Sequence, residues 1–169
     1  FSLEKLTWLN GEHIRRLDPQ KFHELALKYY PEGVRHLDLE KISRLIQIRI
    51  ERFTEIPTMV KFLYELPDYD PALFENPKSK STLQSSREIL QEVIPLLESM
   101  QEWTNESLFS ALKEFATLHD YKIGTIMWPI RTALSGQFAS PGGATELADL
   151  LGKKETLRRL KIGLAKLQP

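Results

Sequence analysis

The chain contains no cysteine among its 169 residues. That absence excludes disulfides and cysteine-ligated zinc or iron–sulfur centres, and it fits a reducing compartment such as the cytoplasm, where we expect the protein. The histidines, His13, His23, His36 and His119, do not have the spacing of metal ligands. Phosphate-binding and zinc-hydrolase motifs are also missing, so we expect no metal site and no catalytic residues.

Long apolar runs are missing as well. No stretch approaches the ~20 apolar residues that a membrane-spanning helix needs, so we expect no membrane partner. The opening FSLEKLTWLN does not have the composition of a secretory signal peptide. It lacks an initiator Met and begins inside a pattern, which indicates a piece of a longer protein.

The chain has no net charge, which argues against nucleic-acid binding when charge is considered alone. The charges are unevenly distributed, however. Residues 1–62 carry 11 basic and 9 acidic side chains, residues 63–119 carry 4 and 10, and residues 120–169 carry 8 and 4. Both ends are therefore more basic than the middle, which allows a local positive surface. Solvated helix faces are the simpler explanation of the same pattern.

The hydrophobic pattern is helical almost throughout, with no alternating strand and no tandem repeat. Asp18 followed by Pro19 predicts the start of a helix that runs to about Tyr30. Asp38 predicts the cap of a longer helix over residues 39–56.

Later polar residues predict three further helix starts, at Ser81 in a capping box with Gln84, at Thr104 and at Thr145. A segment rich in Pro, Asp, Asn and Ser lies between the two halves of the chain. We therefore predict an all-α fold without substantial β-sheet, made of two helical bundles in series: residues 1–66, a linker over 67–80, and residues 81–169.

Arg49 occupies an unusual position on the predicted helix 39–56. At about 100° per residue it faces the middle of an apolar sector that contains Leu45, Ile46 and Phe53. An unpaired buried charge is very unfavourable. Its stem therefore either reaches water or pairs with an acid from another helix, or the guanidinium contacts an anion or a base between the bundles.

A second group of residues shares one flank of the predicted helix 122–135. Arg131, Trp128 and Gly124 lie together there, away from the core sector. An exposed Trp can stack on a nucleobase while the neighbouring guanidinium binds a base edge or a phosphate. Gly124 would let a neighbour approach closely. In the alternative interpretation, Trp128 packs under the following loop as a lid on the core.

That loop has the sequence Ser140-Pro141-Gly142-Gly143. It would expose backbone donors and acceptors that can bind the edge of a flipped-out base, or it is simply a turn between helices.

The last segment is basic, and we expect its cations to lie outward and to contact phosphates unless they are merely solvated. Together with the earlier Lys122, these backbone-contact candidates are Lys153, Lys154, Arg158 and Arg159. An apolar seam on the opposite face comprises Leu157, Leu160, Leu164 and Leu167.

Taken together, these segments resemble one known family. FSLEKLTWLNGEHIRRL resembles the segment that follows the catalytic portion of bacterial glutamyl-tRNA synthetases, and RLIQIRIERFTEIPTMVKFLY resembles their next helical segment. KIGTIMWPIRTALSG and LLGKKETLRRLKIGLAKL resemble the end of their anticodon-binding region. The resemblance spans the whole chain, and its last fifty residues are the most specific part.

The family joins glutamate to its tRNA with ATP, in an N-terminal domain whose two ATP-binding signatures this chain lacks. The resemblance therefore implies a catalytically silent, tRNA(Glu)-binding C-terminal region of two α-helical bundles. Residues 1–66 would link it to the catalytic part, and ATP and Mg²⁺ would belong to that catalytic part alone. We expect the region to be monomeric. The competing hypothesis is a helical protein-interaction scaffold that binds no RNA.

The resemblance also implies residue roles. Arg131 matches the family's reader of the first anticodon base, and Trp128 replaces a frequent Gln, which favours stacking over hydrogen bonding. Ser140 to Gly143 match a loop that contacts anticodon bases, although Gly143 lacks the usual apolar side chain. Arg49 matches an Arg that favours the third anticodon base of tRNA(Glu) over that of tRNA(Gln).

Overall fold

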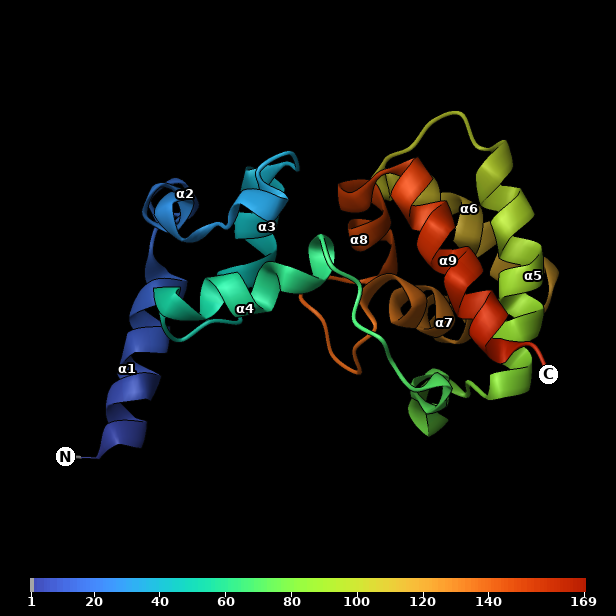
Figure 1. The fold of residues 1–169 in the computed structure, drawn as a ribbon, viewed down its shortest axis with the longest axis horizontal. Coiled ribbons are helices and arrows are strands. Elements are labelled where there is room, and N and C mark those ends of the chain that lie inside the picture. The colour runs from blue at the N-terminus through green and yellow to red at the C-terminus, as the bar shows by residue number, and fades with distance from the viewer. Residues whose placement is uncertain (1) are drawn as a thin grey trace. The chain divides into compact units, whose positions relative to one another are not determined.

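The computed structural model describes residues 2–169, so Phe1 of the opening motif lies outside the described residues. Within that range every regular element is helical, which confirms the all-α prediction (Figure 1). The single β-type pairing among the described residues is an isolated bridge between Asn76 and Ser81. The chain divides into two compact units, Phe1–Glu65 and Leu66–Pro169.

The first unit is built from short helices. Its α-helices are α1 (Leu3–Arg16), α2 (Pro19–Ala26), α3 (Leu39–Ile46) and α4 (Ile56–Val60). Four short 3-10 turns accompany them: η1 (Leu27–Tyr29) and η2 (Glu32–Val34) between α2 and α3, η3 (Phe53–Glu55) before α4, and η4 (Lys61–Leu63) after it. Asp18 and Asp38 cap α2 and α3 through their side chains, as the sequence predicts. Phe22, Ile42 and Ile46 form part of the buried core.

The predicted helix over 39–56 is too long, because α3 ends at Ile46. Gln47 is buried there, and its amide donates to the carbonyls of Ile14 and Leu17 at 3.0 and 2.9 Å. These bonds tie the end of α1 to Gln47: the Ile14 carbonyl accepts the Gln47 amide in addition to the Leu17 N–H at 3.1 Å, and the Leu17 carbonyl lies just beyond the helix. The Glu55 carboxylate then accepts bonds from the backbone of the turn that follows Ile50. Tertiary bonds of Gln47 and local bonds of Glu55 thus hold the chain in a non-helical course where the hydrophobic pattern would continue the helix.

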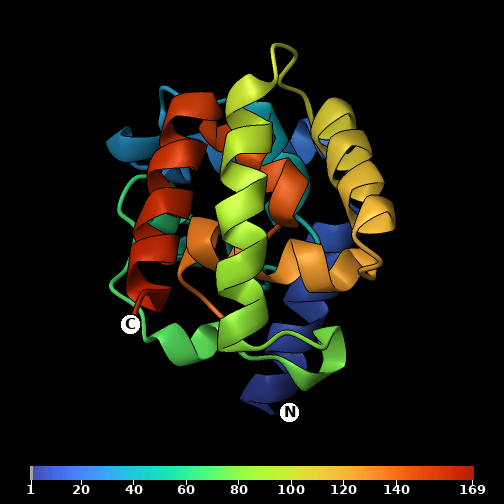
Figure 2. The same ribbon diagram turned by 90° about the vertical axis from the view of Figure 1, so that its right-hand side faces the viewer.

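The second unit is a larger bundle. Its α-helices are α5 (Leu83–Ser99), α6 (Asn105–Leu118), α7 (Ile123–Ser135), α8 (Ala144–Leu151) and α9 (Lys153–Leu167), preceded by the 3-10 turns η5 (Pro71–Phe74) and η6 (Pro77–Ser79). Helices α5 and α9 run antiparallel side by side, and α7 packs against α8 and α9 (Figures 1 and 2). Helix α7 therefore lies at the centre of the bundle's contacts.

Residues 67–80, predicted as a linker, belong to the second unit instead. Phe74 is fully buried and Tyr69 is nearly so. The Thr125 hydroxyl of α7 donates to the carbonyl of Ser79 at 2.6 Å. The polar composition of this segment serves turn formation, while its aromatic side chains anchor it to the bundle.

Two of the predicted caps differ in detail. Helix α5 is capped by Thr82, which exchanges hydrogen bonds with Ser85, rather than by Ser81 with Gln84. Helix α8 begins one residue before Thr145, and the Glu146 carboxylate accepts the Gly143 N–H at 2.9 Å. Thr104 caps α6 as the sequence predicts.

No helix within residues 2–169 is both long and apolar enough to cross a membrane.

Candidate nucleic-acid interface

Arg131 is held in a fixed position at the end of α7. Its guanidinium lies over the Trp128 ring at 4.6 Å from the centroid. It also donates to the Ser140 hydroxyl at 2.7 Å and to the Phe138 carbonyl at 2.5 Å. Partial burial lowers the pKa of Arg131, because desolvation disfavours the charged form, although an Arg of this kind stays protonated at neutral pH. These contacts hold the Arg131 guanidinium next to the loop that follows α7, which contains Phe138 and Ser140.

Trp128 is partly buried, and the structure combines features of both sequence-based interpretations. Its indole N–H donates to the Leu73 carbonyl at 3.0 Å. Phe138 meets its ring edge-on, with centroids 5.3 Å apart. The loop after α7 therefore does pack on Trp128, as the lid interpretation expects. One side of the side chain still borders an open pocket.

This pocket, of about 450 Å³, lies wholly within the second unit. Its walls come from the first turns of α6 and α8, from α7 and from η6, and its lining includes Asn105, Phe109, Gly124, Met127, Trp128, Arg131 and Glu146. The predicted group of Arg131, Trp128 and Gly124 is thus brought together on one surface. Gly124 does not accommodate a close neighbour, because a Cβ built there would meet nothing within 4 Å. It leaves the pocket open instead.

The loop from Ser140 to Gly143 is more enclosed than predicted. Pro141 and Gly142 are buried, whereas Ser140 and Gly143 are partly exposed. The Ser140 hydroxyl donates to the Gly142 carbonyl at 3.1 Å, and Gly142 has a φ of 92°, a conformation that favours glycine. Ser140 and Gly143 are therefore the accessible members, and Pro141 and Gly142 shape the turn.

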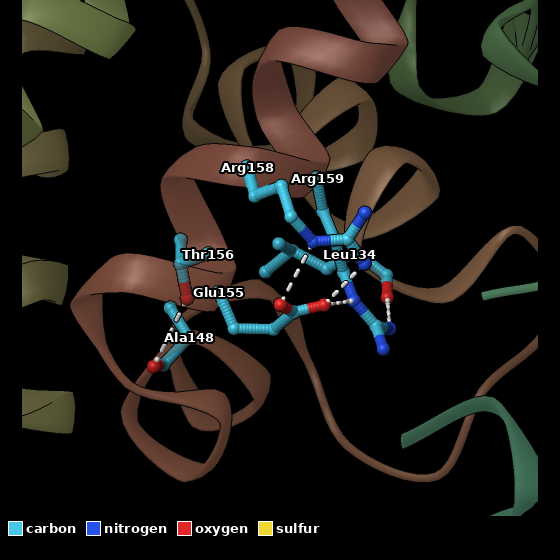
Figure 3. Close-up of polar contacts among 6 residues, drawn as sticks. All are labelled: Leu134, Ala148, Glu155, Thr156, Arg158 and Arg159. Carbon is cyan, nitrogen blue, oxygen red and sulfur yellow. Dashed lines mark hydrogen bonds and ion pairs between the residues drawn. The ribbon is translucent and has the colours of Figure 1, made fainter. Parts of the chain in front are cut away.

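Arg159 does not lie outward as predicted. It is 1% exposed, and it donates to Glu155 Oε1 at 2.9 Å and to the Leu134 carbonyl at 2.7 Å (Figure 3). A Cβ at Gly163 would lie 2.9 Å from the Ala133 side chain, so this glycine allows α9 to approach α7 closely. The face of α9 that contains Arg159 consequently turns inward, and Arg159 is a structural residue.

Lys153 is also tied into the fold. Its ammonium donates to the carbonyls of Glu98 and Met100, at 2.9 and 2.5 Å, at the end of α5. These contacts satisfy terminal carbonyls and complement the negative end of the helix dipole. Lys153 therefore caps α5 within the bundle, and contact with a phosphate would compete with that role.

The remaining predicted backbone contacts are exposed: Lys122, Lys154 and Arg158. Arg158 pairs with Glu155 at 2.6 Å (Figure 3). Hydrogen bonding from Arg158, aided by Arg159, lowers the pKa of Glu155 from 4.5 to about 2, even though partial burial opposes the shift. Lys122 precedes α7 and Lys154 lies in the first turn of α9, so both are accessible to solvent.

Arg49 belongs to the first unit and is exposed, because α3 ends before it. It donates to the Leu45 carbonyl at 2.5 Å and makes no ion pair within residues 2–169. The prediction that it points into an apolar sector is therefore wrong, since it assumed a continuous helix to residue 56. Its exposure leaves the guanidinium accessible to a ligand.

Sequence reasoning missed Asn105, Phe109 and Phe138. Phe109 follows Leu108 immediately and is 45% exposed, so it stands off the buried stripe of α6. An aromatic residue off the apolar stripe of an amphipathic helix was the available indication. In the part of the chain that the structure describes, no three His, Cys, Asp or Glu side chains cluster as metal ligands.

Fold and site together define an all-α binding module that presents an anchored arginine beside an aromatic-lined pocket. A family model described as "Anticodon binding domain" matches residues 21–164. The match covers most of the chain, which therefore belongs to the anticodon-binding domain family.

Several curated relatives support this assignment. The chain is 46% identical over 169 residues to a protein named glutamate–tRNA ligase from Clostridium botulinum, covering 99% of this chain and 35% of the relative. It is 45% identical over 170 residues to the protein of that name from Clostridium tetani, again covering 99% and 35%. The chain thus spans about a third of the length of these relatives.

A solved structure shares the fold. The crystal structure of a glutamate tRNA ligase from Elizabethkingia meningosepticum, in complex with its amino acid, superposes with a TM-score of 0.80 at 21% identity. The likeness covers 99% of this chain and 33% of that one.

Proposed function

We propose that this chain is the part of a glutamate–tRNA ligase that recognises the anticodon loop of tRNA(Glu). Membership of the anticodon-binding family and identity to proteins named glutamate–tRNA ligase support the proposal. The longer protein would join glutamate to tRNA with ATP and Mg²⁺ in the cytoplasm, and its catalytic groups would lie outside this chain. We expect this chain to act as a monomer in binding one anticodon loop.

The observation that carries the proposal is the fixed Arg131. Its stacking on Trp128 and its bonds to Ser140 and Phe138 reduce its freedom before any ligand binds. A pre-ordered side chain loses less entropy on binding, which increases both affinity and selectivity. A guanidinium beside a pocket at a loop offers several donors to the edge of an unstacked base.

The test compares Arg131→Ala with wild type on two RNA hairpins, one with the glutamate anticodon and one with its first base replaced. By analogy with base readout worth about 1–3 kcal/mol, Arg131→Ala should weaken cognate binding roughly 5- to 150-fold. It should also reduce the difference between the hairpins. Arg16→Ala is the matched control, because Arg16 is 82% exposed on α1 and lies in the other unit.

Equal weakening of both hairpins by Arg131→Ala would contradict base recognition and leave only a contribution of charge. The helical-scaffold alternative predicts no RNA binding by the wild type at all.

We also propose that Arg49 contacts the third anticodon base. Its exposure and its lack of an acidic partner among residues 2–169 support this role.

A further inference from the structure

The pocket beside Arg131 has an aromatic wall on α6. Phe109 and Asn105 both line it and lie four residues apart on this helix. Residues with that spacing share one helix face, so the start of α6 presents both side chains to the same space. Phe109 is 45% exposed, so much of its ring is not used by the core.

Phe109 and Trp128 differ in what already contacts their rings. Trp128 has the Arg131 guanidinium over its ring and Phe138 against it. Among residues 2–169, Phe109 has neither an aromatic partner nor a cation over its ring. The available stacking surface of the pocket is therefore Phe109, whereas Trp128 is occupied in positioning Arg131.

Polar groups around the pocket favour a base over a phosphate. The side-chain oxygen of Asn105 is buried and has no hydrogen-bond partner within the described residues. An acceptor left unpaired costs about 1–3 kcal/mol, and because this oxygen is buried, a donor from a ligand reaches it once the Asn105 side chain rotates toward the pocket. Glu146 also lines the pocket and would repel a phosphate. A nucleobase, by contrast, combines a flat face with N–H donors and carbonyl acceptors on its edge.

We infer that this pocket receives one unstacked base of the anticodon loop, with Phe109 as its stacking wall. The inference rests on the proposed function and adds a contact surface on α6 to it. Arg131 lines the same pocket, so its guanidinium is available to the edge of a base stacked on Phe109. The pocket is open beside Gly124, since a Cβ there would meet no atom within 4 Å apart from its chain neighbours and its own helix backbone.

The probe is an RNA hairpin with the anticodon arm of glutamate tRNA, in which 2-aminopurine replaces each loop base in turn. Stacking on an aromatic ring quenches 2-aminopurine fluorescence. We expect the wild type to quench one loop position through this pocket. Phe109→Ala should abolish that quenching and weaken binding roughly 5- to 150-fold, the equivalent of about 1–3 kcal/mol for one stacked base. Phe109→Tyr should retain both.

Leu118→Ala provides the matched control, because Leu118 lies on the same helix, is 75% exposed and does not line the pocket. It should bind and quench like the wild type, and thermal unfolding should show that all variants are folded. If the wild type binds the hairpin but Phe109→Ala leaves affinity and quenching unchanged, the inference is wrong and the proposed function stands. If the wild type does not bind the hairpin, both are wrong.

Discussion

Two arginines of the second unit have different roles: Arg159 stabilises the fold, and Arg131 is available to a ligand. Arg159 is enclosed and bonded to Glu155 and to the Leu134 carbonyl, so its charge is compensated by the fold. Arg131 is only partly buried, and its side-chain partners are an aromatic ring, a hydroxyl and a carbonyl. With no carboxylate in contact among residues 2–169, Arg131 keeps its charge available to a ligand. Stability and binding should therefore separate cleanly when the two are substituted.

Arg159→Met tests the structural role. Removing the Arg159 guanidinium leaves the buried Leu134 carbonyl without its donor, while Glu155 keeps Arg158, so the free energy of unfolding should fall by about 1–3 kcal/mol. Calorimetry should show a much lower Tm. Arg158→Met is the control, because Arg158 is 55% exposed and contacts the same Glu155, and it should lower the stability by at most about 1 kcal/mol. Equal effects of the two substitutions would refute the buried role of Arg159.

Arg49→Gln tests the proposed contact in the first unit. The exposed guanidinium makes a single hydrogen bond with a backbone carbonyl, so stability should change by less than about 0.5 kcal/mol. Binding measured against the anticodon arms of tRNA(Glu) and tRNA(Gln) should show reduced preference for the former. An unchanged preference would remove Arg49 from the set of base-contacting residues.

At the level of elements, the structure shows which helix ends are locally encoded. The caps at Asp18, Asp38 and Thr104 were predictable, because each depends on a side chain bonding to its own backbone within three residues. The end of α3 was not, since the Gln47 bonds reach carbonyls at least 30 residues earlier in the chain. Local pattern gives helix starts, and tertiary partners decide some helix ends.

In helix α9 too, the local sequence pattern did not predict which face is buried, and this affected the predicted site residues. Its leucine spacing predicted a seam at Leu157, Leu160, Leu164 and Leu167, yet only Leu160 of these is fully buried. The close approach allowed by Gly163 selects the face that includes Arg159 instead. By contrast, the grouping of Gly124, Trp128 and Arg131 follows from helical spacing alone, and the structure confirms that grouping. Their RNA-binding role stays a prediction.

The pairing within α9 also predicts a pH dependence. The pKa of Glu155 is about 2 in the folded chain and 4.5 ordinarily, so ionised Glu155 stabilises the fold above about pH 5. This contribution disappears as the pH falls from 4.5 towards 2, because the folded state then also takes up the proton. The Glu155→Gln variant should therefore be less stable than the wild type at pH 7 and nearly equal to it at pH 2.

The carboxylate is 32% exposed, so solvent screening reduces the difference at pH 7 to about 1–2 kcal/mol. Urea unfolding across this pH range measures it. A stability difference between Glu155→Gln and wild type that stays constant down to pH 2 would contradict the pairing of Glu155 with Arg158 and Arg159.

For the whole molecule, attraction to RNA depends on how many cations are already paired within the fold as well as on the net charge. The chain is neutral overall, and several cations of its basic last segment are engaged with carboxylates or carbonyls within the fold. Non-specific attraction to RNA should therefore be modest and should weaken with salt. Selective binding then has to come from a few ordered contacts such as those of Arg131.

The most direct measurement is a titration of this chain with two RNA hairpins that differ only in the anticodon, at two salt concentrations. We predict tighter binding to the glutamate anticodon, by a ratio that persists when salt lowers both affinities. Equal affinity for the two hairpins at both salt concentrations would contradict base recognition by this helical module.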